Sequence, residues 1–356
     1  MYPYNEPDLF ERLAKERPTV LLYGMGNGAD KIIAALEAKS IPVAGVFASD
    51  GFVRGQIFHG MRVMSFSEVK AAFDPADTVI LLSFGSSRPE VLETIGQVAA
   101  AFPLLVPDLP VCGGDTFDAA MCRRRRDELE AARALFCDAE SKALYDKIVR
   151  FRLNGSLELL LEAVSTRDPL QILKESPITV RKMADFGAYN GDSAREALTH
   201  FDLDFILAAE PDARNFKKLS AWSETVSACE VECHRVAVCD RVGEAAFDDS
   251  GNRNAGLCTG RSRVTVPTAT PDSLLVGRDV DYIKYDIEGA EAGALRGSAD
   301  CIRRCRPALR VALYHRGADL FELPLLVSDL CEDYRFYLTR AAGVPAWDID
   351  LVAVPK

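Results

Sequence analysis

The stretch MADFGAYNGDSAREAL, residues 183–198, decides the fold. Its apolar start predicts a strand that reaches an aspartate, its centre is rich in glycine, and its end has the apolar spacing of an amphipathic helix. A strand, a glycine-rich turn and a helix in this order are typical of a doubly wound α/β sheet, in which ligands bind outside the carboxyl ends of the strands. The nature of that ligand depends on the residues around the turn.

These residues favour a cationic ligand over a phosphate. Gly187 and Gly191 allow a tight turn and a close approach of ligand to backbone, but their spacing is not GxGxxG. Asp185 and Asp192 flank the turn with negative charge, which repels a pyrophosphate and suits an amino group or a sulfonium. Glu210 ends the next predicted strand, where an acid accepts hydrogen bonds from ribose hydroxyls. S-adenosylmethionine (SAM) combines a ribose with a cationic sulfur.

A simpler alternative stays open for the same residues. Asp192 would then be only a helix N-cap, and the pair Glu210-Pro211 would only end a strand.

Strand-like and helix-like segments alternate twice along the chain, over residues 19–110 and again from about residue 177. Between them the sequence is rich in Leu, Ala, Arg and Glu and has helical periodicity. The sequence therefore predicts an α/β protein with two doubly wound, Rossmann-like domains at 1–117 and 177–356, joined by a helical connector at 118–176.

The composition limits the class of protein. The net charge of −11 argues against a nucleic-acid partner, since such proteins present a basic face. No apolar run approaches the ~20 residues that span a bilayer, and the acidic start of the chain does not resemble a signal peptide, so we expect a cytoplasmic protein. The ten cysteines include no CxxC pair, which indicates reduced thiols rather than structural zinc.

Six segments resemble the FkbM family of methyltransferases, over roughly residues 135–356. They are ADFGAYNGD (184–192), AAEPDARNFKKL (208–219), RVAVCDRVGEAAF (235–247), TATPDSLL (268–275), DYIKYDIEGAEAGALRG (281–297) and LYHRGADLFELPLL (313–326). Pro271 departs from the family pattern, which commonly has Leu there. The resemblance implies a class I methyltransferase fold, SAM as methyl donor and, for most members, transfer to oxygen. The expected cofactor-binding residues are Asp185, Gly187, Ala188, Tyr189, Asn190, Gly191, Ser193, Glu210, Pro211 and Ala237.

The segment YIKYDIEGAE, residues 282–291, carries the candidate catalytic groups. Strand alternation predicts that Lys284, Asp286 and Glu288 lie on one side, with Lys284 as the charge partner of Asp286. His315 ends the next predicted strand and is the expected base for a hydroxyl acceptor. Glu291 is read as an acid at a helix N-terminus.

Three alternatives remain for this chemistry. In the first, His315 is a structural, hydrogen-bonded histidine. In the second, Asp286, Glu288 and His315 bind a divalent ion that acidifies the acceptor hydroxyl. In the third, the base is Glu288 or a residue of DDSGNRNAG, residues 248–256.

A second glycine turn, YGMGNGAD at residues 23–30, places Gly24, Gly26 and Gly28 after a predicted strand, and Asp50 ends the next one. Residues 41–69 resemble small nucleotide-sugar-binding domains that precede bacterial sugar acyltransferases. A nucleotide-sugar site, an NAD-type site, and a scaffold or dimerisation surface all remain open.

The sequence as a whole predicts a SAM-dependent methyltransferase acting on a hydroxyl of a sugar, nucleotide sugar or other small metabolite. The alternatives are an NAD-dependent oxidoreductase and a nucleotide-sensing module that uses residues 1–117. A homo-oligomer is possible for the protein under any of these interpretations.

Overall fold

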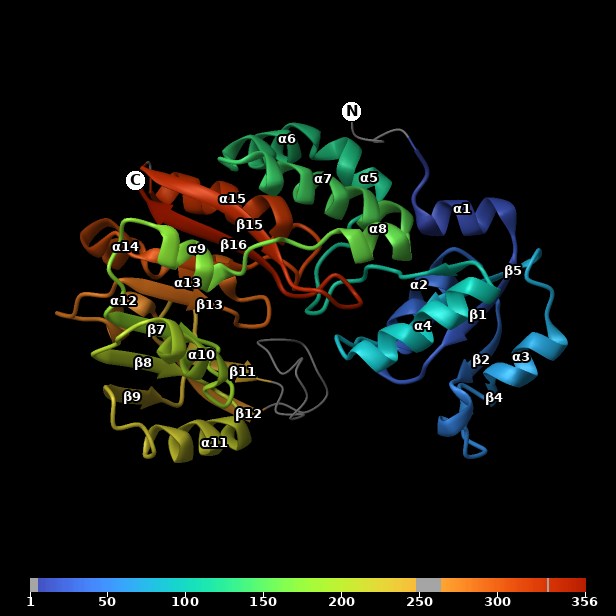
Figure 1. The fold of residues 1–356 in the computed structure, drawn as a ribbon, viewed down its shortest axis with the longest axis horizontal. Coiled ribbons are helices and arrows are strands. Elements are labelled where there is room, and N and C mark those ends of the chain that lie inside the picture. Colours follow the sequence, from blue (N-terminus) through green and yellow to red (C-terminus); the bar gives the residue numbers. More distant parts are fainter. Residues whose placement is uncertain (1–5, 248–263, 332) are drawn as a thin grey trace.

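The computed structural model describes residues 6–247, 264–331 and 333–356. Two open sheets lie side by side, and a group of helices covers them (Figure 1). The predicted α/β class with parallel sheets is confirmed. None of the helices in the described ranges combines the length and the apolar content needed to cross a bilayer.

The N-terminal sheet has the strand order β3-β4-β2-β1-β5-β6 in the described part of the chain. Its strands are parallel except for β3, which runs antiparallel to β4. Continuous apolar runs such as TVLLY form its centre, as expected for parallel strands covered on both faces. The strands are β1 (Thr19–Tyr23), β2 (Val43–Ala48), β3 (Ile57–Phe58), β4 (Met61–Ser65), β5 (Thr78–Leu82) and β6 (Leu104–Leu105), and the helices are α1 (Leu9–Glu16), α2 (Asn27–Ala38), α3 (Phe66–Ala72) and α4 (Pro89–Ala101).

The C-terminal sheet has the strand order β15-β16-β14-β13-β7-β8-β9 among the described residues. Strand β16 runs antiparallel to both of its neighbours, and the other pairs are parallel. The order reverses between β7 and β13, which is where doubly wound sheets bind ligands. The strands are β7 (Lys182–Phe186), β8 (Phe205–Ala209), β9 (Glu230–His234), β13 (Tyr282–Tyr285), β14 (Ala308–Ala312), β15 (Tyr334–Arg340) and β16 (Ile349–Pro355), and the helices are α10 (Asp192–His200), α11 (Ala213–Ser223), α13 (Glu291–Arg296), α14 (Ala299–Cys305) and α15 (Asp319–Leu330).

A small third sheet lies at the edge of this unit and was not predicted. It consists of β10 (Ala237–Val238), β12 (Val264–Ala269) and β11 (Gly243–Phe247). The segment VECHRVAVCD, expected as one strand, is divided between β9 and β10, which belong to different sheets. Pro271 fits its place without strain, because it is the first residue of α12 (Pro271–Leu274), where the missing N–H has no helical partner.

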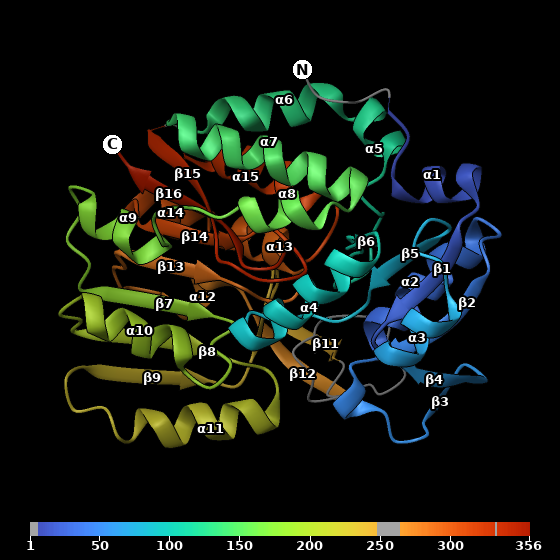
Figure 2. The ribbon, with the colours of Figure 1, turned by 45° about the vertical axis from the view of Figure 1, so that its right-hand side comes forward.

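Five helices connect the two sheets along the chain, and Figure 2 shows α6, α7 and α9 beside the C-terminal sheet. Helix α7 begins where the Asp138 side chain accepts from the backbone N–H of Ser141, and it ends at Gly155 in the left-handed conformation. The backbone N–H of Leu338 in β15 donates to the Ser141 hydroxyl at 3.0 Å, which ties α7 to the C-terminal sheet. The connector helices are α5 (Ala119–Arg124), α6 (Arg126–Leu135), α7 (Ala139–Asn154), α8 (Leu157–Glu162) and α9 (Pro169–Glu175).

Two buried arginines join the connector to the loops of the C-terminal unit. Arg152 of α7 forms an ion pair with Asp108 at 3.2 Å and donates to the carbonyl oxygen of Gly317 at 3.0 Å. Arg340, at the end of β15, donates to the carbonyl oxygens of Leu160 and Ala163 at 2.9 and 2.7 Å. Both guanidinium groups are thus paired where water cannot reach them, which holds the loops rigidly.

Candidate active site

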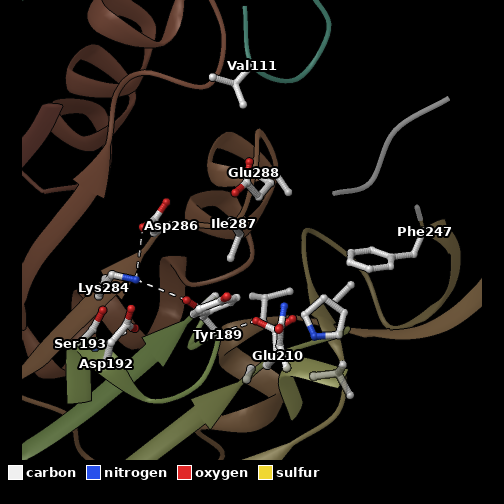
Figure 3. Close-up of a pocket in the computed structure, with 18 of the residues that line it drawn as sticks. Val111, Tyr189, Asp192, Ser193, Glu210, Phe247, Lys284, Asp286, Ile287 and Glu288 are labelled. Carbon is white, nitrogen blue, oxygen red and sulfur yellow. Dashed lines mark hydrogen bonds and ion pairs between the residues drawn. The ribbon is translucent and has the colours of Figure 1, made fainter. Parts of the chain in front are cut away.

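A cavity of about 400 Å³ opens at the carboxyl ends of β7, β8 and β13 (Figure 3). This size lies within the range of small-molecule sites, and the place is the switch point of the sheet. Nine predicted site residues line it: Gly187, Tyr189, Ser193, Glu210, Pro211, Ala237, Lys284, Asp286 and Glu288. Five others do not: Asp185, Ala188, Asn190, Gly191 and His315 are absent from the cavity wall.

The two glycines of the turn are required by packing as well as by any ligand. Gly187 has φ +83°, and a Cβ there would lie 1.8 Å from the carbonyl oxygen of Asp286. Gly191 has φ +84°, and a Cβ there would lie 2.3 Å from the ring of Trp222. The turn is therefore pressed against β13 on one side and α11 on the other. Asp192 is the first residue of α10 and not its N-cap, which is Gly191.

Below the turn, Lys284 lies between two carboxylates. Its Nζ is 3.4 Å from Oδ1 of Asp185 and 3.5 Å from Oδ2 of Asp286 (Figure 3 shows the second contact). Burial raises the pKa of Asp185, and the ammonium of Lys284 opposes this. Burial also acts to raise the pKa of Asp286, but Lys284, His315 and Arg310 outweigh it and keep that pKa below its ordinary value. Asp185 therefore acts through Lys284 from beneath the cavity, and Asp286 presents a stable negative charge.

Glu210 is fixed by two backbone N–H groups. Its Oε2 accepts from Tyr189 and its Oε1 from Asp212, each at 2.9 Å. Burial raises its pKa to about 7, although both hydrogen bonds act to lower it. Each carboxylate oxygen keeps a second lone pair, so this residue can accept two further hydrogen bonds from a ligand in the cavity.

His315 is surrounded by acids and is fully buried. Its Nδ1 donates to Oε1 of Glu291 at 2.9 Å, and its Nε2 lies 3.5 Å from Oδ1 of Asp286 and from Oε2 of Glu288. Burial acts to lower the pKa of His315, but these carboxylates outweigh it and raise the pKa to about 10. At neutral pH His315 is an imidazolium ion.

This arrangement differs from the expectation that His315 is the base. A protonated imidazole cannot take a proton, and its ring does not reach the cavity wall. Glu288 does line the cavity, and burial raises its pKa to about 7 against the opposing charge of His315. Glu291, expected only as a helix-end acid, orients His315 and also accepts from the backbone N–H of Ile287 at 2.9 Å. Within the described ranges no cluster of three or more His, Cys, Asp or Glu is arranged to hold a metal ion.

Residues 185–342 match the family model of the methyltransferase FkbM domain. This segment, which is less than half of the chain, is similar to an FkbM methyltransferase domain. The crystal structure of methyltransferase FkbM from Methylobacillus flagellatus KT has a similar fold, with a TM-score of 0.71 and 18% sequence identity, over 97% of this chain and 92% of that one. No curated protein sequence matches significantly.

Two further solved structures resemble part of the chain. An rRNA methylase from Streptococcus thermophilus has a TM-score of 0.36 and 12% identity, over 54% of this chain and 99% of that one. A Streptococcus mutans methyltransferase solved in complex with S-adenosylhomocysteine (SAH) has a TM-score of 0.35 and 11% identity, over 54% of this chain and 100% of that one.

Several residues of the methyltransferase cavity were not singled out from the sequence. Tyr314 precedes His315, and its hydroxyl donates to Oδ1 of Asp286 at 3.1 Å. Its place in LYHRG could have revealed it. Trp347 and Val111 carried no signal, because they come from segments distant in sequence. The candidate base segment 248–256 lies outside the described residues. Asp192, expected as a negative charge beside the turn, also lines the cavity. The other lining residues that the sequence did not single out are Ala209, Asn215, Val236, Val238, Phe247, Ile287, Ala290 and Asp348.

The N-terminal glycine turn is filled by its own sheet. A Cβ on Gly24 would lie 2.6 Å from the ring of Phe84, and one on Gly28 would lie 2.2 Å from the carbonyl oxygen of Ser83. Only at Gly26, where φ is +96°, does a Cβ meet open space. Asp50 accepts hydrogen bonds from the backbone and hydroxyl of Ser67 at the surface. These contacts favour the scaffold alternative for this turn.

Proposed function

We propose that the protein is a SAM-dependent methyltransferase that methylates a hydroxyl group of a sugar or another small metabolite. The observation that carries the proposal is Glu210, an acid held by two backbone amides one strand away from the glycine turn. This is the geometry that binds a ribose edge in doubly wound sheets. The matched FkbM domain supports the same reaction class.

The charged and hydrogen-bonding residues of the cavity fit SAM. Glu210 and Asp286 provide negative charge, while Lys284, the basic side chain among the described lining residues, is already held by two carboxylates. An orphaned buried oxygen, Oδ2 of Asp185, adds to the negative potential beneath the turn. When bound, SAM supplies a methyl group on a positively charged sulfur. The residues that would hold it are Glu210 at the ribose and the turn around Tyr189 at the amino-acid end.

The chain's own groups then divide the remaining work. Glu288 accepts the proton that the acceptor hydroxyl loses, because its pKa of about 7 lets it exist as the carboxylate at neutral pH and return the proton to water. His315, fixed by Glu291, stabilises the charged forms of Glu288 and Asp286 and is a positioning residue. Lys284 holds Asp286 in place below them.

Calorimetry tests the proposal directly. Wild-type protein is titrated with SAM, SAH, NAD and a nucleotide sugar, and SAM and SAH are expected to bind. Glu210→Ala should weaken SAM binding by about 1–3 kcal/mol, which is the cost of losing a charge-assisted hydrogen bond in a buried site. Glu224→Ala is the matched control, since that glutamate is exposed at the end of α11. Unchanged SAM affinity in a folded Glu210→Ala variant would contradict the assignment of the pocket.

A further inference from the structure

Part of the cavity wall lies outside the segment that matches the FkbM domain. Val111 precedes residues 185–342, and Trp347 and Asp348 follow them, yet all three line the cavity. In Figure 3 Val111 lies beyond Glu288, on the side away from Glu210. If Glu210 holds the ribose and Glu288 meets the reacting hydroxyl, this wall faces the methyl acceptor.

The N-terminal sheet sets the position of Trp347. Gly85, just after β5, would carry a Cβ only 2.6 and 2.9 Å from two atoms of the Trp347 ring, so the indole lies directly against its backbone. The adjacent Ser86 exchanges two backbone hydrogen bonds with Val344, at 2.7 and 3.0 Å. From the other side Arg340 donates to the carbonyl oxygens of Gly343 and Pro345. The segment that immediately precedes Trp347 is therefore held both by Ser86 and by Arg340.

The N-terminal unit also fixes the opposite part of this wall. Lys31 of α2 donates to the carbonyl oxygens of Pro110 and Val111, each at 2.8 Å. The backbone N–H of Cys112 donates to the carbonyl oxygen of His315 at 3.0 Å, so the segment around Val111 is also joined to the loop after β14 that carries His315. Two separate attachments thus connect the N-terminal sheet to the acceptor end of the cavity.

The charge of this end limits what can enter it. Asp286, Glu288 and Asp348 contribute carboxylates, whereas Lys284 already lies between two acids. Among the described residues that line this end, no cation is free to balance a phosphate, so its charge would meet these carboxylates unfavourably in a partly desolvated site. An uncharged ring that bears hydroxyls fits better, since its apolar face can stack on an indole and its hydroxyls can donate to carboxylates.

We infer that Trp347, held in place by Gly85 of the N-terminal sheet, is a specificity residue for the methyl acceptor, and that this acceptor is an uncharged hydroxylated ring without phosphate. The inference rests on the proposed function. It gives the N-terminal sheet a role in acceptor selection that does not require a nucleotide at its glycine turn. Trp347 would contact the acceptor, and Gly85 would be a positioning residue.

One experiment tests the acceptor class. The full-length protein and radiolabelled SAM are incubated with a mixture of neutral methyl glycosides and nucleoside-diphosphate sugars, and the products are separated by anion exchange. Label is expected in the uncharged fraction. Label in the anionic fraction, or none in the uncharged fraction, overturns the inference. SAH calorimetry on the same sample keeps the two proposals apart, because loss of the methyltransferase function itself would appear as absent SAH binding.

Variants test the role of Trp347 with the best neutral acceptor. Gly85 has no positive φ, so Gly85→Ala acts through the space against the indole of Trp347 and the neighbouring ring of Pro345. It should raise the acceptor KM about 10-fold or more with kcat little changed. Gly96→Ala in α4 is the control, because a Cβ there meets no atom within 4 Å. Trp347→Ala leaves the N-terminal sheet untouched and should give the same rise. SAH affinity should stay constant in all three variants. An unchanged acceptor KM in Gly85→Ala or Trp347→Ala would refute the assignment.

Discussion

Replacing His315 by glutamine removes a buried positive charge from among three carboxylates and leaves them without that cation. The ring lies 2.9 Å from Glu291 and 3.5 Å from both Asp286 and Glu288. We expect a large loss of stability whose size depends on pH, because the charge exists only while the imidazole is protonated.

The magnitude follows from the pKa of His315. Burial opposes the charge, but the surrounding carboxylates raise the pKa from its ordinary value of 6.5 to about 10 in the folded protein. Between these two values the folded state keeps a proton that the unfolded chain has released. The stabilisation is therefore fully present below pH 6.5 and is lost as the pH rises through about 10. A difference of this size corresponds to about 5 kcal/mol.

Urea unfolding of wild type and His315→Gln at pH 6, 8 and 9.5 and constant ionic strength measures this effect. The difference in the free energy of unfolding should be several kcal/mol at pH 6 and should shrink steadily toward pH 9.5. His59→Gln is the control: its pair with Asp30 is about half exposed, so the change should stay below about 1 kcal/mol. A His315→Gln difference that does not vary with pH would show that His315 is neutral in the folded protein and refute the reasoning.

Three further predictions concern the base and the packing. Glu288→Gln should lower turnover about 10²–10⁴-fold with SAM affinity retained, and wild-type turnover should rise as the pH passes about 7; an unaltered rate would move the base elsewhere. Gly187→Ala should lower the free energy of unfolding in urea by at least about 3 kcal/mol, because its methyl group would overlap the carbonyl oxygen of Asp286. Gly51→Ala is the control and should leave that free energy unchanged, since a Cβ there meets no atom within 4 Å. Equal values for the two variants would contradict the close packing at Gly187. Arg340→Met should lower the free energy of unfolding by about 2–5 kcal/mol, because it leaves the buried carbonyl oxygens of Leu160 and Ala163 without their donor. Scanning calorimetry should show no such loss for Arg335→Met, since Arg335 is exposed.

The alternation of parallel strands with helices and the floor of the cavity could be predicted from the sequence because both depend on local patterns. Apolar runs followed by glycine turns predict parallel strands, and the acids that end them, such as Glu210 and Asp286, necessarily gather at one edge of the sheet. The pairing of Lys284 with Asp286 was expected from the cost of burying a lone charge. Its second partner, Asp185, depends on the register of β7 against β13, which no local pattern defines.

The protonation of His315 and the wall around Trp347 could not be predicted, because each arises where several distant segments meet. The charge on His315 depends on Glu291, and an acid at a helix N-terminus is already explained by the helix dipole, so nothing in the sequence indicated that the two residues pair. The indole of Trp347 meets Gly85 across a separation in sequence that propensity and periodicity do not bridge. The small sheet of β10, β11 and β12 was missed because β10 has only two residues and β11 is mostly exposed, so neither shows the apolar pattern of a core strand.

The attachment of α7 to β15 has a consequence for how the chain divides into autonomous pieces. The backbone of Cys137 donates to Phe336 in β15 at 2.9 Å, so the segment before α7 covers what would otherwise be an open sheet edge. A fragment that began at residue 177 would expose that edge and leave the guanidinium of Arg340 without its carbonyl partners. The folding unit thus begins before the segment that the family model matches. Limited proteolysis should release a stable piece that begins before Phe136, not one that begins near β7.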